Sequence, residues 1–331
     1  MRRAVRGAVD DFDQGGLVLV ALSGGPDSLA LAAALAFEAP RAGIRGGAVI
    51  IDHGIQSGSA EVAARAARQA RELALDPVRI ERVHLGTAGG PEAAARTARY
   101  EALERVASEL GAHAVLLAHT LDDQAETVLL GLVRGSGAAS LQGMPARRAM
   151  ASGTGFFSRP LLGIRRATTV QACADAGLEP WTDPQNADPA FTRVRVRRTV
   201  LPLLEAELGP GVIEALARTA AQLREDADAL DTFAEELIED LADHAEAGIS
   251  LDVPALAANP PALRQRLIRL AVASEFGVAL SRAQTLEVAR LVTDWHGQEG
   301  VDLPGIRVVR RDGRLHFSGQ HSEAKGSDGT A

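Results

Sequence analysis

The first 135 residues alternate short apolar runs with longer helix-like segments, and this alternation restricts the fold more than any other feature. Mostly apolar runs at 17–22, 47–51 and 113–118 are typical of strands buried on both faces. A further run at 77–84 alternates in polarity. The intervening segments predict helices over 28–37, 59–74, 91–110 and 122–133. The alternation predicts an α/β fold with a doubly wound, Rossmann-like parallel sheet, which binds ligands at the carboxyl ends of its strands.

Composition sets the outer limits. The chain has 331 residues, 46% of them apolar and 24% charged, which is ordinary for a globular protein of about two domains. No apolar run reaches the roughly 18 residues of a membrane span. Acidic residues follow the basic N-terminus where a signal peptide has an apolar core, so we predict a cytoplasmic protein without a membrane partner. The single cysteine, Cys173, excludes an internal disulfide and disfavours sulfur-relay chemistry.

The periodic pattern loosens after residue 134. Clustered glycines predict loops and short strands over 135–160, followed by helices near 166–176 and over 192–208. Beyond them we expect one long or broken helix over 212–246, helices over 261–276 and 281–293, and a small hairpin over 300–318. The predicted domains are a catalytic domain, 1–209, a smaller and mostly helical domain, 210–319, and a disordered tail, 320–331.

Charge is distributed unevenly along the chain. The formal net charge is −8, yet residues 134–198 hold ten arginines against four acidic residues. A protein that binds nucleic acid needs a basic face even when it is acidic overall, and this segment is the candidate. Residues 225–246 carry ten acidic residues, a pattern typical of a solvated helix face.

A glycine loop follows the first apolar run. It reads Ser23-Gly24-Gly25-Pro26-Asp27-Ser28 and leads directly into a predicted helix. Glycines let the backbone approach a phosphate closely, and the free N–H groups of a helix N-terminus favour anions. A carboxylate such as Asp27 suits this place if it reaches the phosphate through Mg²⁺. The loop lacks the Lys-Ser/Thr ending of a Walker A motif.

A second group of polar residues follows the run at 113–118. It reads His119-Thr120-Leu121-Asp122-Asp123-Gln124-Ala125-Glu126-Thr127, with Arg134-Gly135-Ser136-Gly137 further on. On a helix, Asp122 and Asp123 lie three or four residues before Glu126, so these carboxylates share one face. Together they can hold Mg²⁺ or a cationic amine. Such clustering exceeds what capping of a helix N-terminus requires.

The glycine loop resembles the pyrophosphate loop of the N-type ATP pyrophosphatases, and further motifs narrow the resemblance to the tRNA(Ile)-lysidine synthetase family. Those motifs are the second polar group and the stretches at 49–55, 92–100, 159–162 and 181–202. The resemblance covers residues 15–205. Val194 stands where the family often has Asn, and Gln56 where it often has Arg.

The resemblance implies an adenine nucleotide hydrolase-like fold and a ligase that uses ATP and Mg²⁺. Its partners would be L-lysine and the tRNA(Ile) with a CAU anticodon, and a homodimer stays open. The enzyme would adenylate the wobble cytidine and join lysine to its C2, forming lysidine and releasing AMP and pyrophosphate. The implied catalytic residues are Asp27, Asp123 and Glu126, and the implied metal ligands are Asp27 and Asp122.

The remaining implied contacts concern the nucleotide and the other substrates. For the nucleotide they are Ser23, Gly24, Gly25, Pro26, Asp27, Ser28, Asp52, His53, Arg96 and His119. For the tRNA and lysine they are Asp122, Asp123, Glu126, Arg134, Arg193, Arg195 and Arg197. Which of the side chains of Asp122, Asp123, Glu126 or His119 takes the proton of the lysine amine stays open.

Several alternatives also stay open. Arg96 and Arg99 could contact phosphates or pair with nearby glutamates on the surface of their helix, and Trp181 and Phe191 could stack on a base or pack in the core. Three rival functions are an ammonia-using ligase such as NAD synthetase, a tRNA thiolase and a non-catalytic nucleotide-binding module. The lone Cys173 disfavours the thiolase.

Overall fold

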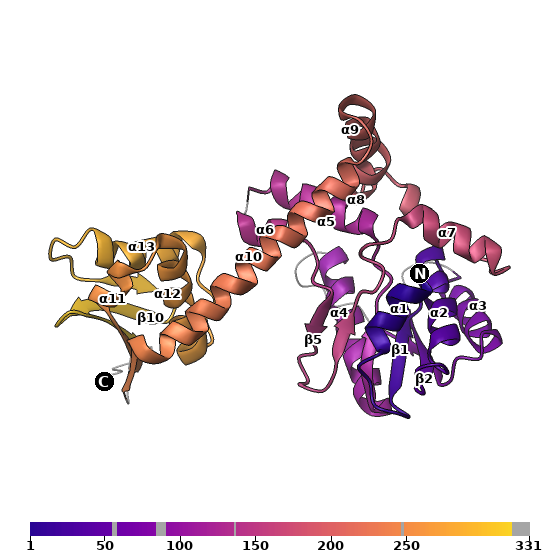
Figure 1. Ribbon diagram of the computed structural model, residues 1–331, viewed down its shortest axis with the longest axis horizontal. Coiled ribbons are helices and arrows are strands. Elements are labelled where there is room, and N and C mark those ends of the chain that lie inside the picture. The colour runs from indigo at the N-terminus through magenta and orange to yellow at the C-terminus, as the bar shows by residue number, and fades with distance from the viewer. Residues whose placement is uncertain (55–57, 84–90, 136, 246–247, 320–331) are drawn as a thin grey trace, which may run out of the picture. The chain divides into compact units, whose positions relative to one another are not determined.

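The computed structural model describes residues 1–54, 58–83, 91–135, 137–245 and 248–319, and it divides into two compact units, Met1–Leu223 and Arg224–Ala331 (Figure 1). The division between the units falls within helix α10 (Val212–Leu241), further along the chain than the expected boundary at 209/210. The reason is packing. Ile213 and Leu216 at the start of α10 join an apolar cluster with Ala125, Val196 and Leu201 of the first unit.

The first unit contains a six-stranded sheet in the order β3-β2-β1-β4-β6-β5. All neighbouring strands are parallel except β5, which is antiparallel to β6. This confirms the predicted parallel α/β sheet. The strands are β1 (Leu17–Ala21), β2 (Arg45–Asp52), β3 (Val78–Arg82), β4 (Ala112–Leu116), β5 (Arg147–Ala149) and β6 (Phe156–Ser158).

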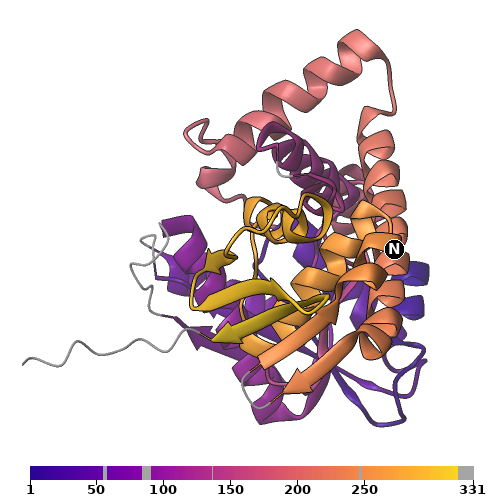
Figure 2. The ribbon, with the colours of Figure 1, turned by 90° about the vertical axis from the view of Figure 1, so that its left-hand side faces the viewer.

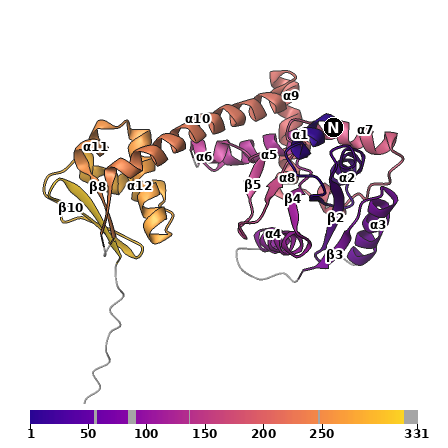
Figure 3. The ribbon, with the colours of Figure 1, turned by 60° about the horizontal axis from the view of Figure 1, so that its bottom comes forward.

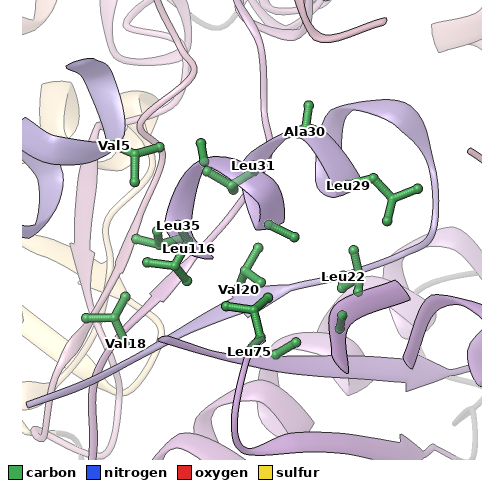
Figure 4. Close-up of a cluster of buried hydrophobic side chains, with 14 of the residues drawn as sticks. Val5, Val18, Val20, Leu22, Leu29, Ala30, Leu31, Leu35, Leu75 and Leu116 are labelled. Carbon is green, nitrogen blue, oxygen red and sulfur yellow. The ribbon is translucent and has the colours of Figure 1, made fainter. Parts of the chain in front are cut away.

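Helices cover both faces of this sheet. On β1, Val18 and Val20 point into a cluster formed with helices α1 (Arg2–Val9), α2 (Pro26–Glu38) and α3 (Ser59–Glu72) (Figure 4). Their neighbours Leu17 and Leu19 point into a separate cluster with α4 (Pro91–Leu110). Figure 3 shows α2 and α4 on opposite sides of the sheet. Because both faces of β1 are buried, this strand is apolar without interruption.

The rest of the first unit is built from short segments. The helices are α5 (Leu121–Val133), α6 (Ala138–Leu141), α7 (Arg166–Asp175), η1 (Pro184–Ala187), α8 (Thr192–Arg195), η2 (Val196–Val200) and α9 (Leu201–Leu208). The helix predicted over 192–208 is therefore three joined segments, of which η2 is a π-helical turn. It precedes Pro202, which has no N–H group to continue the regular hydrogen-bond ladder.

The second unit combines helices with a five-stranded antiparallel sheet of order β7-β8-β11-β10-β9. Figure 2 faces this unit and shows its strands side by side. Its helices are the remainder of α10, α11 (Val253–Ala258), α12 (Pro261–Phe276) and α13 (Arg282–Thr293). Its strands are β7 (Ala242–Ala245), β8 (Gly248–Asp252), β9 (Val301–Leu303), β10 (Ile306–Arg311) and β11 (Arg314–Gly319).

This sheet is larger than the hairpin predicted over 300–318, and the helix predicted to reach residue 246 ends at Leu241. The sequence over 242–245 contains two alanines, which favour a helix locally, but pairing with β8 makes β7 a strand. The predicted tail, 320–331, lies outside the described residues, as do Gln56 and Ser136. Among the residues the structure covers, no helix is long and apolar enough to cross a membrane.

We expect Leu31→Ala to lower the free energy of unfolding of the first unit by about 2–5 kcal/mol, because Leu31 is 0% exposed in the core beneath α2. The matched control is Leu132→Ala on α5, where the side chain is 58% exposed. We expect a change within about 0.5 kcal/mol there. Urea unfolding followed by Trp181 fluorescence in a Trp295→Phe background measures both. Equal effects would contradict the assigned core.

Candidate active site

The glycine loop joins β1 to α2 at the carboxyl edge of the parallel sheet. Gly24 has a φ of +83°, which only glycine adopts without strain, and Gly25 precedes Pro26 at the first position of α2. The Ser23 backbone N–H donates to Ser28 Oγ at 3.1 Å, and the Ser28 hydroxyl donates to the Gly25 carbonyl at 3.0 Å. These bonds hold the loop in the open turn that a phosphate cradle requires.

Asp27, in the first turn of α2, is held from α7. The Thr169 hydroxyl donates to Asp27 Oδ1, and Arg166 Nε donates to Asp27 Oδ2 at 3.3 Å. Burial raises the pKa of Asp27, while the Thr169 bond and the Arg166 charge oppose that rise. The loop carboxylate is thus fixed by residues about 140 positions further along the chain.

Asp123 belongs to a capping box at the start of α5. Its Oδ2 accepts hydrogen bonds from the backbone N–H and the hydroxyl of Thr120, at 2.9 and 2.8 Å. Its Oδ1 accepts bonds from Arg166 at 2.7 Å and from Arg197 at 3.2 Å. Burial works against the ionised form, yet Arg166 and the Thr120 bonds together hold the pKa of Asp123 below its ordinary value.

Glu126 lies one turn further along α5 and is 0% exposed. Arg197 binds it with both ends of its guanidinium, from Nε to Oε1 at 2.6 Å and from Nη2 to Oε2 at 3.0 Å. Arg166 Nη1 donates to Oε1 at 3.4 Å, and Arg193 Nε lies 3.5 Å from Oε2. Three guanidiniums therefore neutralise Asp27, Asp123 and Glu126 as one cluster, which we call the carboxylate–arginine cluster (Asp27, Asp123, Glu126, Arg166, Arg193, Arg197).

A cavity of about 500 Å³ opens between the loop and this cluster, at the carboxyl ends of the strands. The cavity lies at the edge of the sheet where the sequence predicts ligand binding. The predicted residues that line it are Ser23, Gly25, Pro26, Asp27, Ser28, Asp52, His53, Arg96, His119, Asp123, Arg193 and Arg197. Trp181 also lines it, and the Trp181 backbone N–H donates to the Gly24 carbonyl at 2.8 Å.

Other predicted residues lie outside the cavity wall. Glu126 is buried behind the arginines, and Asp122 accepts a bond from the Arg166 backbone N–H at 2.7 Å. Arg134 is exposed at the end of α5. Arg195 turns away and donates to the carbonyls of Pro189 and Ala190 at 2.6 and 2.9 Å. Successive arginines of α8 and η2 point in different directions from the helix axis. Of these arginines, Arg193 and Arg197 reach the carboxylate–arginine cluster.

Sequence reasoning missed Arg166 and Thr169. Arg166 contacts Asp27, Asp123 and Glu126, and the negative charges of these residues raise its pKa despite burial. The available signal was the Arg165-Arg166 pair shortly after the motif at 159–162. The pair belongs to the basic segment 134–198, but no neighbouring residue in the sequence indicates that Arg166 faces carboxylates from other elements.

The surroundings of the two histidines at the strand ends favour their neutral form. Burial lowers the pKa of His119 to about 3, with Arg159, Arg99 and Arg96 adding to the effect and Asp123 opposing it. Burial and Arg99 lower the pKa of His53. Asp52 is a buried turn carboxylate whose Oδ1 accepts the Gly54 N–H at 3.0 Å. A hydrogen bond from Ser59 and the Gly54 N–H hold the pKa of Asp52 low, against the effect of burial.

Asp27 is the carboxylate best placed for a magnesium ion that accompanies nucleotide phosphates. Such an ion needs only one or two protein carboxylates, because phosphates and water supply its other ligands. Within the described residues no three His, Cys, Asp or Glu side chains are grouped to hold a metal by themselves. Asp27 lines the cavity beside the loop, whereas Asp122 does not. Asp27 fits this task as a single ligand.

Cys173 is not a reactive thiol. It is 1% exposed beneath the loop, where its Sγ–H donates to the Pro26 carbonyl at 3.2 Å. Burial, together with the nearby Asp27 charge, raises the pKa of Cys173 to about 11. Nucleophilic sulfur chemistry requires a thiolate near neutral pH. This geometry adds to the argument against a thiolase.

The fold and the loop define a class of protein. The architecture is that of a PP-loop domain: a glycine loop joins the first parallel strand to its helix and faces a cavity at the carboxyl ends of the strands. Residues 2–204 match the PP-loop domain family. Residues 251–316 match the TilS substrate binding domain. The chain belongs to the tRNA(Ile)-lysidine synthase family.

Relatives with that name are similar over nearly their whole length. The tRNA(Ile)-lysidine synthase of Leifsonia xyli subsp. xyli is 64% identical over 92% of this chain and 90% of its own. That of Thermobifida fusca is 54% identical over 96% of both chains. That of Mycobacterium bovis is 51% identical over 89% of both.

A solved structure supports the fold. The U34-tRNA thiolase NcsA from Methanococcus maripaludis, solved with its [4Fe-4S] cluster, aligns with a TM-score of 0.56 at 21% identity. The alignment covers 68% of this chain and 78% of that one. At this identity the likeness shows a shared fold and nothing about the reaction.

We expect native Cys173 to resist a thiol reagent such as DTNB at pH 8, because its pKa of about 11 leaves little thiolate. The folded pKa is raised, so reactivity should appear only as the pH rises towards 11 or once the chain unfolds. Absorbance at 412 nm with and without urea measures this. Rapid labelling of the folded protein at pH 8 would contradict the buried geometry.

We expect Glu126→Ala to lower the free energy of unfolding by about 1–3 kcal/mol, because it removes a buried carboxylate shared by three partly buried guanidiniums and leaves Arg193 without a carboxylate partner. Glu61→Ala, at an exposed position on α3, is the control and should change it by less than about 0.5 kcal/mol. Urea unfolding measures both variants. A neutral result for Glu126→Ala would show that the cluster does not depend on this carboxylate.

Proposed function

We propose that the protein is the ligase that forms lysidine, joining L-lysine to the wobble cytidine of the tRNA(Ile) with a CAU anticodon at the expense of ATP. The observation that carries the proposal is the glycine loop and the carboxylate–arginine cluster facing one cavity, in a chain 64% identical over most of its length to a protein of that name. We propose the cytoplasm as its location.

ATP is the nucleotide that the loop suits. Backbone N–H groups at the start of α2, together with the Ser23 and Ser28 hydroxyls, can hold the β- and γ-phosphates. The cytidine O2 attacks the α-phosphorus, the bond to the pyrophosphate oxygen breaks, and pyrophosphate leaves along the line of attack. Asp27 would hold the Mg²⁺ that offsets charge on the departing pyrophosphate.

Lysine attacks in the second step. Its ε-amine forms a bond to C2 of the adenylated cytidine, AMP leaves, and the amine gives up a proton. Asp123 is the carboxylate we place nearest to this amine, because it lines the cavity and Glu126 does not. Asp123 already accepts hydrogen bonds from Thr120, Arg166 and Arg197, so the lysine amine would replace one of the two guanidiniums. Glu126 positions Arg197 and Arg166 from behind.

The rival functions are less well supported. An ammonia-using ligase needs neither a basic segment that faces RNA nor a second unit related to tRNA. Residues 251–316 of this chain match the TilS substrate binding domain. A non-catalytic nucleotide module would not need a loop carboxylate held in place by two side chains. A homodimer stays a prediction.

We expect the wild-type protein to incorporate radiolabelled lysine into an unmodified tRNA(Ile) transcript with a CAU anticodon, in the presence of ATP and Mg²⁺. Asp27→Ala should lower the rate by at least about 100-fold, because the leaving pyrophosphate loses its metal-bound neutralisation. Asp175→Ala, on the exposed surface of α7, is the control and should retain full activity. Acid-precipitable label measures all three.

Two outcomes of this experiment would contradict the proposal. If the wild type binds ATP but transfers no lysine to this transcript, the protein is a PP-loop enzyme with another acceptor. If Asp27→Ala and the wild type are equally active, the loop carboxylate has no part in the reaction.

A further inference from the structure

The α4 side of the cavity carries guanidiniums without carboxylate partners. Arg96 and Arg99 project from α4 and line the cavity, and Arg159, 4% exposed, lies behind them. Arg159 donates to the Pro145 carbonyl at 2.8 Å and to the Tyr100 hydroxyl at 3.2 Å. Among the side chains that the structure describes, no acidic group forms an ion pair with these three arginines. We call them the α4 arginines (Arg96, Arg99, Arg159).

Arg99 is partly buried and, like Arg159 behind it, has an unpartnered Nε. Burial lowers the pKa of Arg99, and the charges of Arg96 and Arg159 lower it further, with only Tyr100 acting in the opposite direction. A buried charge is normally paired, because its removal from water costs several kcal/mol. A cation held like this in a cavity wall is suited to an anionic ligand.

The two sides of the cavity differ in this respect. On the loop side, Arg166, Arg193 and Arg197 are neutralised by carboxylates of the carboxylate–arginine cluster. On the α4 side, the neighbours of the α4 arginines are the neutral imidazoles of His53 and His119, each with an unpartnered Nδ1. The uncompensated positive charge is therefore confined to the α4 side.

From this contrast we infer that Arg99 and Arg96 bind a backbone phosphate of the RNA strand at the nucleotide that reacts. The inference rests on the proposed function. A phosphate supplies the negative charge and the acceptor oxygens that guanidiniums favour. It would bring the acceptor nucleotide against the α4 wall, beside the strand ends that carry His53 and His119.

The position of the loop separates this phosphate from those of ATP. The loop opens at the N-terminus of α2, on one face of the sheet, and α4 covers the opposite face (Figure 3). With pyrophosphate on the loop, in-line displacement requires the attacking nucleotide to approach from the other side of the α-phosphorus. That approach brings the RNA strand to the α4 arginines.

The test compares Arg99→Met with Arg105→Met. Both residues belong to α4, but Arg105 is half-exposed and pairs with Glu81 at 2.5 Å, outside the cavity. The dissociation constant of the tRNA is measured across a range of KCl concentrations, and that of a non-hydrolysable ATP analogue without tRNA. We expect Arg99→Met to weaken tRNA binding about tenfold and to reduce the log–log salt slope by about 1. Arg105→Met should change neither.

A second arm locates the phosphate. A synthetic tRNA carries a neutral methylphosphonate 5′ to the wobble cytidine. We expect the wild type to bind this tRNA about tenfold more weakly than the unmodified tRNA. Arg99→Met should bind the two tRNAs with nearly equal affinity, because the substitution and the methylphosphonate remove the same contact. Arg99→Lys, which keeps the charge, should recover part of the affinity and guards against a folding defect in the methionine variant.

Other results overturn the inference. Weaker binding of the ATP analogue with an unchanged tRNA salt slope would assign Arg99 to ATP. Additive losses from Arg99→Met and the methylphosphonate would place the phosphate elsewhere. Lysine incorporation by the wild type, measured in parallel, tests the proposed function separately. If no lysine is transferred, both proposals fail. If lysine is transferred but Arg99→Met leaves the salt slope of tRNA binding unchanged, only the phosphate contact fails.

Discussion

Arg166 holds together parts of the first unit that are far apart in the sequence. It contacts Asp27 of α2 and both Asp123 and Glu126 of α5, and its backbone N–H, at the start of α7, donates to Asp122 Oδ2. Three carboxylates placed this close would repel one another, so their positions depend on the guanidiniums between them. The loop, α5 and α7 are therefore held together by one set of charges, and these charges help to shape the cavity.

The division of charge within the cavity follows from this arrangement. Arg166, Arg193 and Arg197 are occupied with carboxylates, so their charge contributes little net attraction for a substrate. Arg96 and Arg99 line the opposite wall among neutral histidines. One cavity thus has a nearly neutral polar side and a positive side, so substrates that carry phosphates and a substrate that carries a cationic amine would be drawn to different sides.

The sequence predicts the local parts of this structure well and the long-range parts poorly. The apolar runs predict the parallel strands, and the residues 23–28 and 119–127 are readable because strand ends meet at one edge of a sheet. Arg166 and Thr169 are not readable, since their partners lie in other elements. Glu126 shares a helix face with Asp122, yet burial separates it from the cavity. β7 was missed because its strand conformation depends on pairing with β8.

The reach of Arg166 and Thr169 across about 140 residues also has a consequence during synthesis. A chain emerging from the ribosome exposes the glycine loop early, but Asp27 acquires both of its side-chain partners only after α7 has emerged, and Glu126 acquires Arg197 later still. A nascent chain shorter than about residue 200 therefore lacks the ion pairs that set the loop carboxylate. The nucleotide site is therefore completed only when nearly the whole first unit has been synthesised, although its loop is among the first segments to emerge.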